Sequence, residues 1–231
     1  MPSTKKSLYF LSSALVTAIS VGVLGYGMST EWATTTMKCA RKELGIFNGT
    51  AVITLKLFDG VLKRFSCPTF DNTDAFQVIP MLKKIGGSSV VLHGLVVCLL
   101  ALCLLFSAVS ILICLYNSVS NPYQTYMGPI GIYTCSSLSA CLSVVVLIIF
   151  VVNVNVTIVA EDLIKNFSGN IAMDLKDQAS EMLVGYYLVI PYMVLSLCAI
   201  ALIYVYDHAA YTHRREQERP TEDAPKEIMM Y

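Results

Sequence analysis

Charged residues are scarce in this sequence. Asp, Glu, Lys and Arg make up 14% of the 231 residues, against about 25% in a typical soluble domain, while hydrophobic residues make up 55%. Acidic and basic residues both number 16, so the net charge is zero. This composition excludes a disordered chain and a nucleic-acid binder that relies on a basic surface. It disfavours an ordinary soluble enzyme and indicates a membrane protein.

Four long segments contain no charged residue at all, and each is long enough to cross the hydrocarbon core of a bilayer as a helix. The segments are residues 8–28, 89–116, 128–152 and 182–206. Because lipid offers no partner to backbone groups, segments that cross it must be helical. The alternative, four buried helices of a soluble bundle, would show polar faces that these segments lack. The sequence therefore predicts four transmembrane helices.

The first apolar segment follows Lys5 and Lys6, as the apolar part of a signal peptide would. It is longer than the usual apolar region of about 7–15 residues, and no clear small-x-small cleavage site follows it. We therefore expect an uncleaved helix.

Basic residues and glycosylation sequons predict the sidedness of the loops. Four spans place both termini on one side, and once the long loop 29–88 is discounted, the remaining Lys and Arg favour a cytoplasmic location for them. The sequons at Asn48, Asn155 and Asn166 all fall in residues 29–88 or 153–181, which we expect to be extracellular. The expected cytoplasmic segments are an N-tail, a loop and a C-tail at residues 1–7, 117–127 and 207–231.

Only two of the eight cysteines lie outside the predicted spans. Cys39 and Cys67 both fall in the loop 29–88, where an oxidising compartment favours a disulfide between them. Closing that loop contributes about 3–4 kcal/mol in the chain-entropy model. The other six are expected to be small apolar packing residues, and Cys114, near the cytoplasmic end of its span, is also a candidate for palmitoylation.

The loop 29–88 carries both strand and helix patterns. Ile53, Leu55 and Leu57 alternate with polar residues, which predicts a half-buried strand followed by a turn at residues 57–60. Further along, Asp71 or Thr73 is a candidate cap of a short helix that Pro80 disturbs. The apolar positions of that helix are Phe76, Ile79, Leu82 and Ile85. Together these patterns predict a small extracellular cap with an amphipathic helix leading into the second span.

In the loop 153–181, apolar residues recur with helical spacing. They are Val159, Leu163, Ile164 and Phe167. We expect the third transmembrane helix to continue beyond the membrane as far as residues 168–170. The predicted fold class is an all-α transmembrane four-helix bundle with a small β-rich extracellular cap.

Two spans carry small residues four positions apart. They are Ala14, Ala18 and Gly22 in the first span, and Ser136 and Ala140 in the third. Small residues let helix backbones approach closely in lipid. This pattern indicates either packing within the bundle, which is the simpler interpretation, or a docking face for another membrane protein.

The spans lack the ionisable groups that catalysis or ion-coupled transport places inside a membrane. His93 is the one imidazole within a span, and we expect it to be hydrogen-bonded or interfacial. His208 and His213 are five positions apart, which does not suit a helical metal pair. The sequence contains no nucleophile elbow and no phosphate-binding glycine loop. We therefore expect no catalytic, cofactor or metal site.

Several motifs resemble the clarin family. The most specific is Ser120-Asn121-Pro122-Tyr123-Gln124-Thr125, followed by Gly128-Pro129-Ile130-Gly131-Ile132-Tyr133. Trp32 after the first span, Cys39, the Asn48 sequon and the turn 57–60 also match, and the resemblance runs nearly end to end.

The resemblance implies a claudin-like four-span glycoprotein with a left-handed bundle and an extracellular sheet built mainly by the first loop. It also implies roles in organising the plasma membrane, its junctions and its actin-linked specialisations, and two members of the family are linked to sensory hair cells. The chain departs from the claudin pattern, because Cys39 and Cys67 are widely spaced and only one tryptophan is present. That departure weakens the case for junction strands or a pore.

The segment 207–231 is polar, carries charges of both signs, and is expected to be a disordered cytoplasmic tail. Met229 and Tyr231 place hydrophobic side chains at the terminus and two residues before it, as a PDZ ligand does. A merely exposed apolar end is the simpler alternative.

The sequence and the resemblance together favour a non-enzymatic scaffold of the plasma membrane. The expected partners are the lipid bilayer, other membrane proteins through helix faces and the first extracellular loop, and a PDZ or cytoskeletal adaptor at the C-terminus, with no nucleic acid. The alternative function is an auxiliary subunit that modulates an ion channel or transporter.

Overall fold

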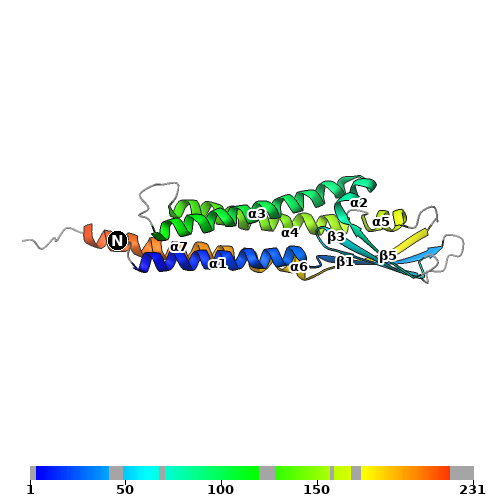
Figure 1. Cartoon of the computed structure of the whole chain (residues 1–231), viewed down its shortest axis with the longest axis horizontal. Coiled ribbons are helices and arrows are strands. Elements are labelled where there is room, and N and C mark those ends of the chain that lie inside the picture. Colours follow the sequence, from blue (N-terminus) through cyan, green and yellow to red (C-terminus); the bar gives the residue numbers. More distant parts are fainter. Residues whose placement is uncertain are drawn as a thin grey trace, which may run out of the picture.

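The computed structural model describes residues 4–41, 49–67, 71–119, 128–156, 159–167 and 173–218, which form a long helical bundle with a cap at one end (Figure 1). The bundle consists of α1 (Thr4–Ser29), α3 (Ser88–Val119), α4 (Pro129–Val156) and α7 (Val189–Glu218). α1 and α4 each pack against both α3 and α7, so the four helices form a ring. α1 begins and α7 ends at the end of the bundle away from the cap.

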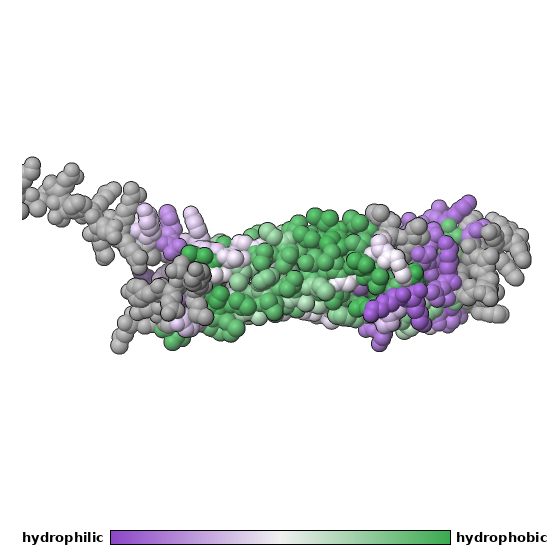
Figure 2. All heavy atoms as spheres, turned by 90° about the horizontal axis from the view of Figure 1, so that it is seen from above, coloured by the Kyte–Doolittle hydropathy of each residue, from purple (hydrophilic) through white to green (hydrophobic). Residues whose placement is uncertain are grey.

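Apolar side chains cover the outside of the bundle, and polar ones lie inside it. Leu8, Leu112 and Ile148 are 67%, 65% and 59% exposed, whereas Ser110 and Ser143 are fully buried. Figure 2 shows that, on the face in view, the bundle is hydrophobic along its middle and more hydrophilic toward both ends. A soluble bundle would have the reverse distribution, so the soluble alternative is excluded. All four helices are long and apolar enough to cross a membrane.

The cap is a five-stranded antiparallel sheet with two helices packed on one face. The strand order is β4-β3-β2-β1-β5. The strands are β1 (Ala33–Arg41), β2 (Gly49–Leu55), β3 (Asp59–Phe65), β4 (Asn72–Gln77) and β5 (Met173–Met182), and the helices are α2 (Val78–Ile85) and α5 (Val159–Phe167). Because β5 pairs with β1, the sheet joins chain segments that lie before α3 and after α4.

The central hairpin of the sheet lies where the sequence predicts a strand and a turn. β2 ends at Leu55, and the backbone N–H of Lys56 donates to the carbonyl oxygen of Asp59 at 2.9 Å, which closes the turn into β3. Ile53 of β2 and Leu62 of β3 are buried on the face that α2 and α5 cover. The alternation of apolar and polar residues therefore correctly predicts which face of the hairpin is covered.

The helix predicted from Asp71 or Thr73 is wrong in its first half. Residues 72–77 form β4, which pairs with β3, and α2 begins only at Val78. The side chain of Asp71 accepts a hydrogen bond from the backbone of Ser66 instead of capping a helix. Pro80 lies in the first turn of α2, where its missing N–H costs no helical hydrogen bond.

Two other predicted boundaries also differ from the structure. The tail, expected to be disordered from residue 207, is helical as far as Glu218, where α7 ends. The last span, expected from residue 182, is preceded by β5 and by the short helix α6 (Val184–Tyr187). Pairing with Ala33 keeps Met182 in β5.

The third long helix is expected from the sequence to continue to residues 168–170. The structure has helix at Pro129–Val156 (α4) and again at Val159–Phe167 (α5), and the two residues between them lie outside the described residues.

Candidate functional site

Trp32 joins the bundle to the cap immediately after α1. Its indole Nε1 donates to the carbonyl oxygen of Gly27 at 2.8 Å, and its backbone is hydrogen-bonded to Leu55 and to Leu183, both at 2.8 Å. The side chain is fully buried, and its ring lies 5.0 Å from the ring of Phe150 on α4. Trp32 therefore contacts α1, α4, the end of β2 and the segment after β5. We call this set of contacts the Trp32 junction.

A glycine makes room for this junction. A Cβ atom at Gly185 of α6 would lie 2.5 Å from Cδ1 of Trp32, which is closer than side-chain carbons approach. The backbone N–H of Gly185 donates to the carbonyl oxygen of Glu31 at 2.8 Å. Position 185 needs glycine because the two backbones pass so closely around the indole.

A second connection between bundle and cap runs from α3 to the β2–β3 turn. Nε2 of His93 lies 2.8 Å from the carbonyl oxygen of Leu57, and both side chains are buried. Since a carbonyl oxygen can only accept, Nε2 carries the proton. This contact agrees with the hydrogen-bonded role expected for His93.

The disulfide predicted between Cys39 and Cys67 is present. It joins β1 to the residue that follows Ser66 at the end of β3, with the two Cα atoms 5.9 Å apart. Gly49 of β2 packs closely against the disulfide: a Cβ atom at this position would lie 2.8 Å from the Sγ of Cys39. The disulfide thus fixes the end of the sheet away from the bundle, while the Trp32 junction fixes the other end.

Hydroxyl groups connect the helices inside the bundle. The hydroxyl of Tyr192 on α7 donates to the carbonyl oxygen of Cys103 at 3.1 Å and lies 2.8 Å from Oγ of Ser107 on α3. Oγ of Ser110 on α3 lies 3.1 Å from Oγ of Ser136 on α4. Such bonds are worth about 0.6 kcal/mol each in membrane bundles, so they orient the helices more than they stabilise them.

The face of the sheet opposite α2 and α5, here called the open face, carries β-branched side chains. Thr34, Thr54 and Val61 form one cross-strand row, and Thr36 and Val52 belong to the next. All five side chains are partly exposed. No element within the described residues covers them as α2 and α5 cover the opposite face.

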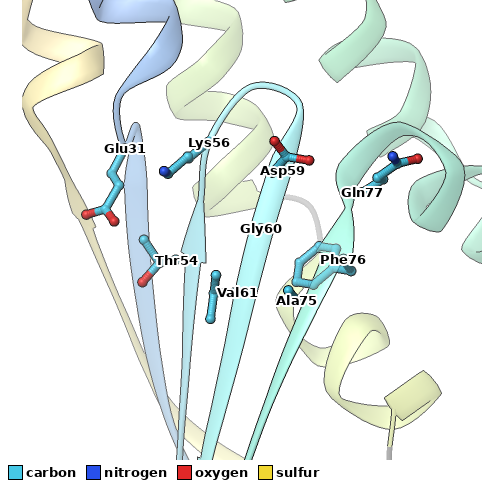
Figure 3. Close-up of a pocket in the computed structure, with 9 residues that line it drawn as sticks. All are labelled: Glu31, Thr54, Lys56, Asp59, Gly60, Val61, Ala75, Phe76 and Gln77. Atoms are coloured by element: carbon cyan, nitrogen blue, oxygen red, sulfur yellow. The ribbon is translucent and has the colours of Figure 1, made fainter.

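A cavity of about 290 Å³ lies at the bundle end of the open face (Figure 3). Thr54 and Val61 line it, and Figure 3 shows Glu31, Lys56 and Asp59 grouped at one end of it. The described residues include no cluster of three metal-ligating side chains there or elsewhere. The open face and its cavity therefore offer hydrogen bonds, mixed charge and apolar area, which suit contact with another surface.

The small residues predicted for helix packing divide into two groups. Ala14, Ser136 and Ala140 are buried between helices of the bundle. Ala18 and Gly22 are exposed on α1, and a Cβ added at Gly22 would meet nothing within 4 Å. An apolar groove of about 580 Å³ runs between α1 and α3 beside them. Its lining residues are Leu8, Leu11, Ser12, Ala14, Leu15, Ala18, Ile111 and Leu115.

The remaining predicted sites have different structural settings. Cys114 is fully buried with its Sγ 3.7 Å from Oγ of Ser13, so its environment favours packing over palmitoylation. Asn155 lies in the last turn of α4 and Asn166 on α5, and both side chains are exposed. Asn48, Asn121, Pro122, Met229 and Tyr231 lie outside the described residues.

The motif around residue 128 has a structural explanation. Pro129 is the first residue of α4, where proline is favoured, and the N–H of Gly131 donates to the carbonyl oxygen of Gly128 at 3.1 Å. Tyr133 is partly buried and packs against the core at the end of the bundle away from the cap. The motif therefore specifies how α4 starts.

Sequence reasoning missed Tyr192 and Gly185. Tyr192 lies in an apolar run in which nothing distinguishes a bundle-facing tyrosine from one in an interfacial belt. Gly185 precedes Tyr186 and Tyr187 without any turn pattern, and only the position of Trp32 in space explains it. In both cases the missing information is a contact between residues distant in sequence.

Four long apolar helices joined to a five-stranded cap define a multi-pass membrane protein with a claudin-like four-span fold. A family model described as Clarin-2-like matches residues 5–178. The chain is 32% identical to Clarin-3 of Mus musculus, 31% to Clarin-3 of Homo sapiens and 33% to Clarin-3 of Rattus norvegicus, in each case over 100% of both chains. The chain therefore belongs to the clarin family.

Proposed function

We propose that this clarin-family protein is a non-enzymatic organiser of the plasma membrane, which holds partner proteins through its cap at junctional or actin-linked specialisations. The observation that carries the proposal is the open face of the sheet. Its β-branched rows and cavity are fixed to a membrane bundle at one end by the Trp32 junction and at the other by the disulfide. A surface that no other described element covers, held at a set distance from the membrane, suits binding of other proteins.

The open face gives a direct test by substitution. Thr54→Arg combined with Val61→Arg is expected to lower recovery of cross-linked neighbours from epithelial membranes by about tenfold or more, because two charges would be buried in the contact. The matched control is Asp162→Arg on α5, whose exposed side chain lies outside the open face. Equal recovery from both variants, at equal surface levels, would contradict the proposal.

A second function, an auxiliary subunit of a channel or transporter, is favoured by one observation. The exposed Ala18 and Gly22 and the adjoining apolar groove lie on a membrane-spanning helix, where close helix packing is possible. A partner there would be another membrane protein held in stoichiometric amounts. We infer the same orientation for both functions: the cap is extracellular and carries glycans on its sequons, and both termini are cytoplasmic. In this orientation Tyr231 would meet a cytoplasmic adaptor.

Ala18→Phe tests this second function. A phenyl ring at the centre of a helix contact costs about 1–3 kcal/mol, so we expect recovery of a membrane partner to fall by tenfold or more in mild detergent. Ala201→Phe on α7 is the control, since Ala201 is exposed on a different helix and lines no part of the groove. If both variants retain the partner equally, α1 is not the docking helix.

A further inference from the structure

The outer edge of β4 presents backbone groups to its surroundings. The turn closed between Lys56 and Asp59 fixes which residues of β3 face β2, and the N–H of Val78 donates to the carbonyl oxygen of Phe58 at 2.8 Å. The even-numbered residues of β4 therefore bond to β3, and the odd-numbered residues, such as Ala75, direct their N–H and C=O groups away from the sheet.

Four of these outward groups remain available for pairing. The N–H of Thr73 is already bonded to the side chain of Asn72 at 2.8 Å, and the C=O of Gln77 belongs to the first turn of α2. The C=O of Thr73, both backbone groups of Ala75 and the N–H of Gln77 have no hydrogen-bond partner among the described residues. They form the alternating acceptor and donor pattern that a neighbouring strand uses.

The opposite edge of the sheet is protected in ways that β4 is not. β5 contains a register shift, and Asp177 at that point has a positive φ of 57°. Lys176, Asp177 and Glu181 place charges of both signs along β5. Bulges and charges are the devices that prevent an edge from pairing with another chain. The one charged side chain of β4, Asp74, is paired with Arg64 of β3, and the register of β4 with β3 is continuous.

A cleft of about 500 Å³ lies beside the same edge, between β4, α2 and α5. Phe76, Met81 and Phe167 supply its apolar surface, and the rings of Phe76 and Phe167 are 5.5 Å apart. Lys84 is the one charged residue among the described residues that line it, and its side chain is exposed. A side chain from a strand added to β4 would enter this cleft, because alternate residues of a strand point to the covered face.

We propose that the β4 edge binds an extended segment of a partner protein by strand addition. The segment places an apolar side chain in the cleft against Phe76 and Met81 and a carboxylate opposite Lys84. The backbone bonds supply affinity, and the cleft and Lys84 select the segment. This inference rests on the proposed contact function of the cap, but it names a different surface from the open face.

The test uses the full-length protein in lipid nanodiscs and a phage-displayed library of random ten-residue peptides as the probe. Selected peptides are expected to share an apolar residue near an acidic one. Their binding should weaken about tenfold or more in Ala75→Pro, which removes an outward N–H but leaves the β3 ladder intact. Ala75→Ser keeps the N–H and should bind as the wild type does. Lys84→Glu should weaken the binding of acidic peptides and leave the binding of their amide analogues unchanged.

Three results would overturn the strand-addition proposal. The first is that no peptide is enriched on the wild type. The second is that the enriched peptides bind the Ala75→Pro variant as tightly as the Ala75→Ser variant. The third is that a photo-reactive residue at position 81 cross-links only to its own chain or to a second copy. Persistence of the Cys39–Cys67 disulfide in each variant verifies that the cap is folded. Thr54→Arg alone, on β2 of the open face and not paired with β4, should leave peptide binding unchanged, so failure here is distinguishable from failure of the open-face contact.

Discussion

Replacing Trp32 with alanine is expected to destabilise the protein by about 3–5 kcal/mol and to loosen the cap from the bundle. The substitution removes the largest fully buried side chain, its hydrogen bond to Gly27 and its contact with Phe150. Thermal unfolding followed by circular dichroism in nanodiscs, together with limited proteolysis of the cap, measures both effects. Trp32→Phe keeps a ring beside Phe150 and should be less damaging. A melting curve for Trp32→Ala that superimposes on the wild type would contradict this account.

Gly185→Ala provides an independent test of the same junction. A single added methyl group would collide with the indole of Trp32, so we expect a loss in the same direction although no contact is deleted. Gly22→Ala is the matched control, because a Cβ there meets nothing within 4 Å and alanine favours a helix. Equal stability of the two glycine variants would mean that the Trp32 junction accommodates the added methyl group without loss.

Removal of the disulfide has the second large expected effect. Cys39→Ser or Cys67→Ser should lower the stability of the cap by about 3–4 kcal/mol, because β1 and the end of β3 are then no longer linked in the unfolded chain. Surface yield and protease resistance of the cap are the measurements. Cys98→Ser, at an exposed free cysteine of α3, is the control. Cap protection that is unchanged in Cys39→Ser would show that the sheet alone maintains the cap.

The four helices could be predicted because charge is excluded from lipid wherever a helix crosses it. The β2–β3 hairpin could be predicted because Ile53 and Leu55 alternate with polar residues over one covered face. The two edge strands, β4 and β5, could not be predicted in this way. β4 was assigned to a helix because Phe76 and Ile79 have helical spacing, and its pairing with β3 is decided by a neighbouring strand. β5 is exposed and charged, so it shows neither pattern.

The candidate sites were harder to predict for a related physical reason. In a membrane the lipid and the bundle core are both apolar, so hydropathy does not say which side of α1 faces inward. Ala14 and Ala18 have the same spacing and chemistry, yet one is buried and the other exposed. Trp32 was marked by the family motif alone, and its role emerged only when Phe150 and Leu183 were placed around it.

The open face is the part of the account that connects the fold to function. Its rows depend on the register of β1, β2 and β3, and its position depends on the Trp32 junction and on the contact of His93 with Leu57. Substitutions at the junction should therefore impair partner binding without touching the open face itself. Substitutions on the open face should impair binding while stability stays unchanged.

Site-specific photo-cross-linking from the open face tests this claim most directly. A photo-reactive amino acid replaces Thr54 in one variant and Asp162 in another, and both are expressed at equal surface levels in epithelial cells. The account predicts a discrete protein adduct from position 54, abolished by Trp32→Ala, and none from position 162. Adducts only with lipid or water from position 54, or the same adducts from both positions, would contradict it.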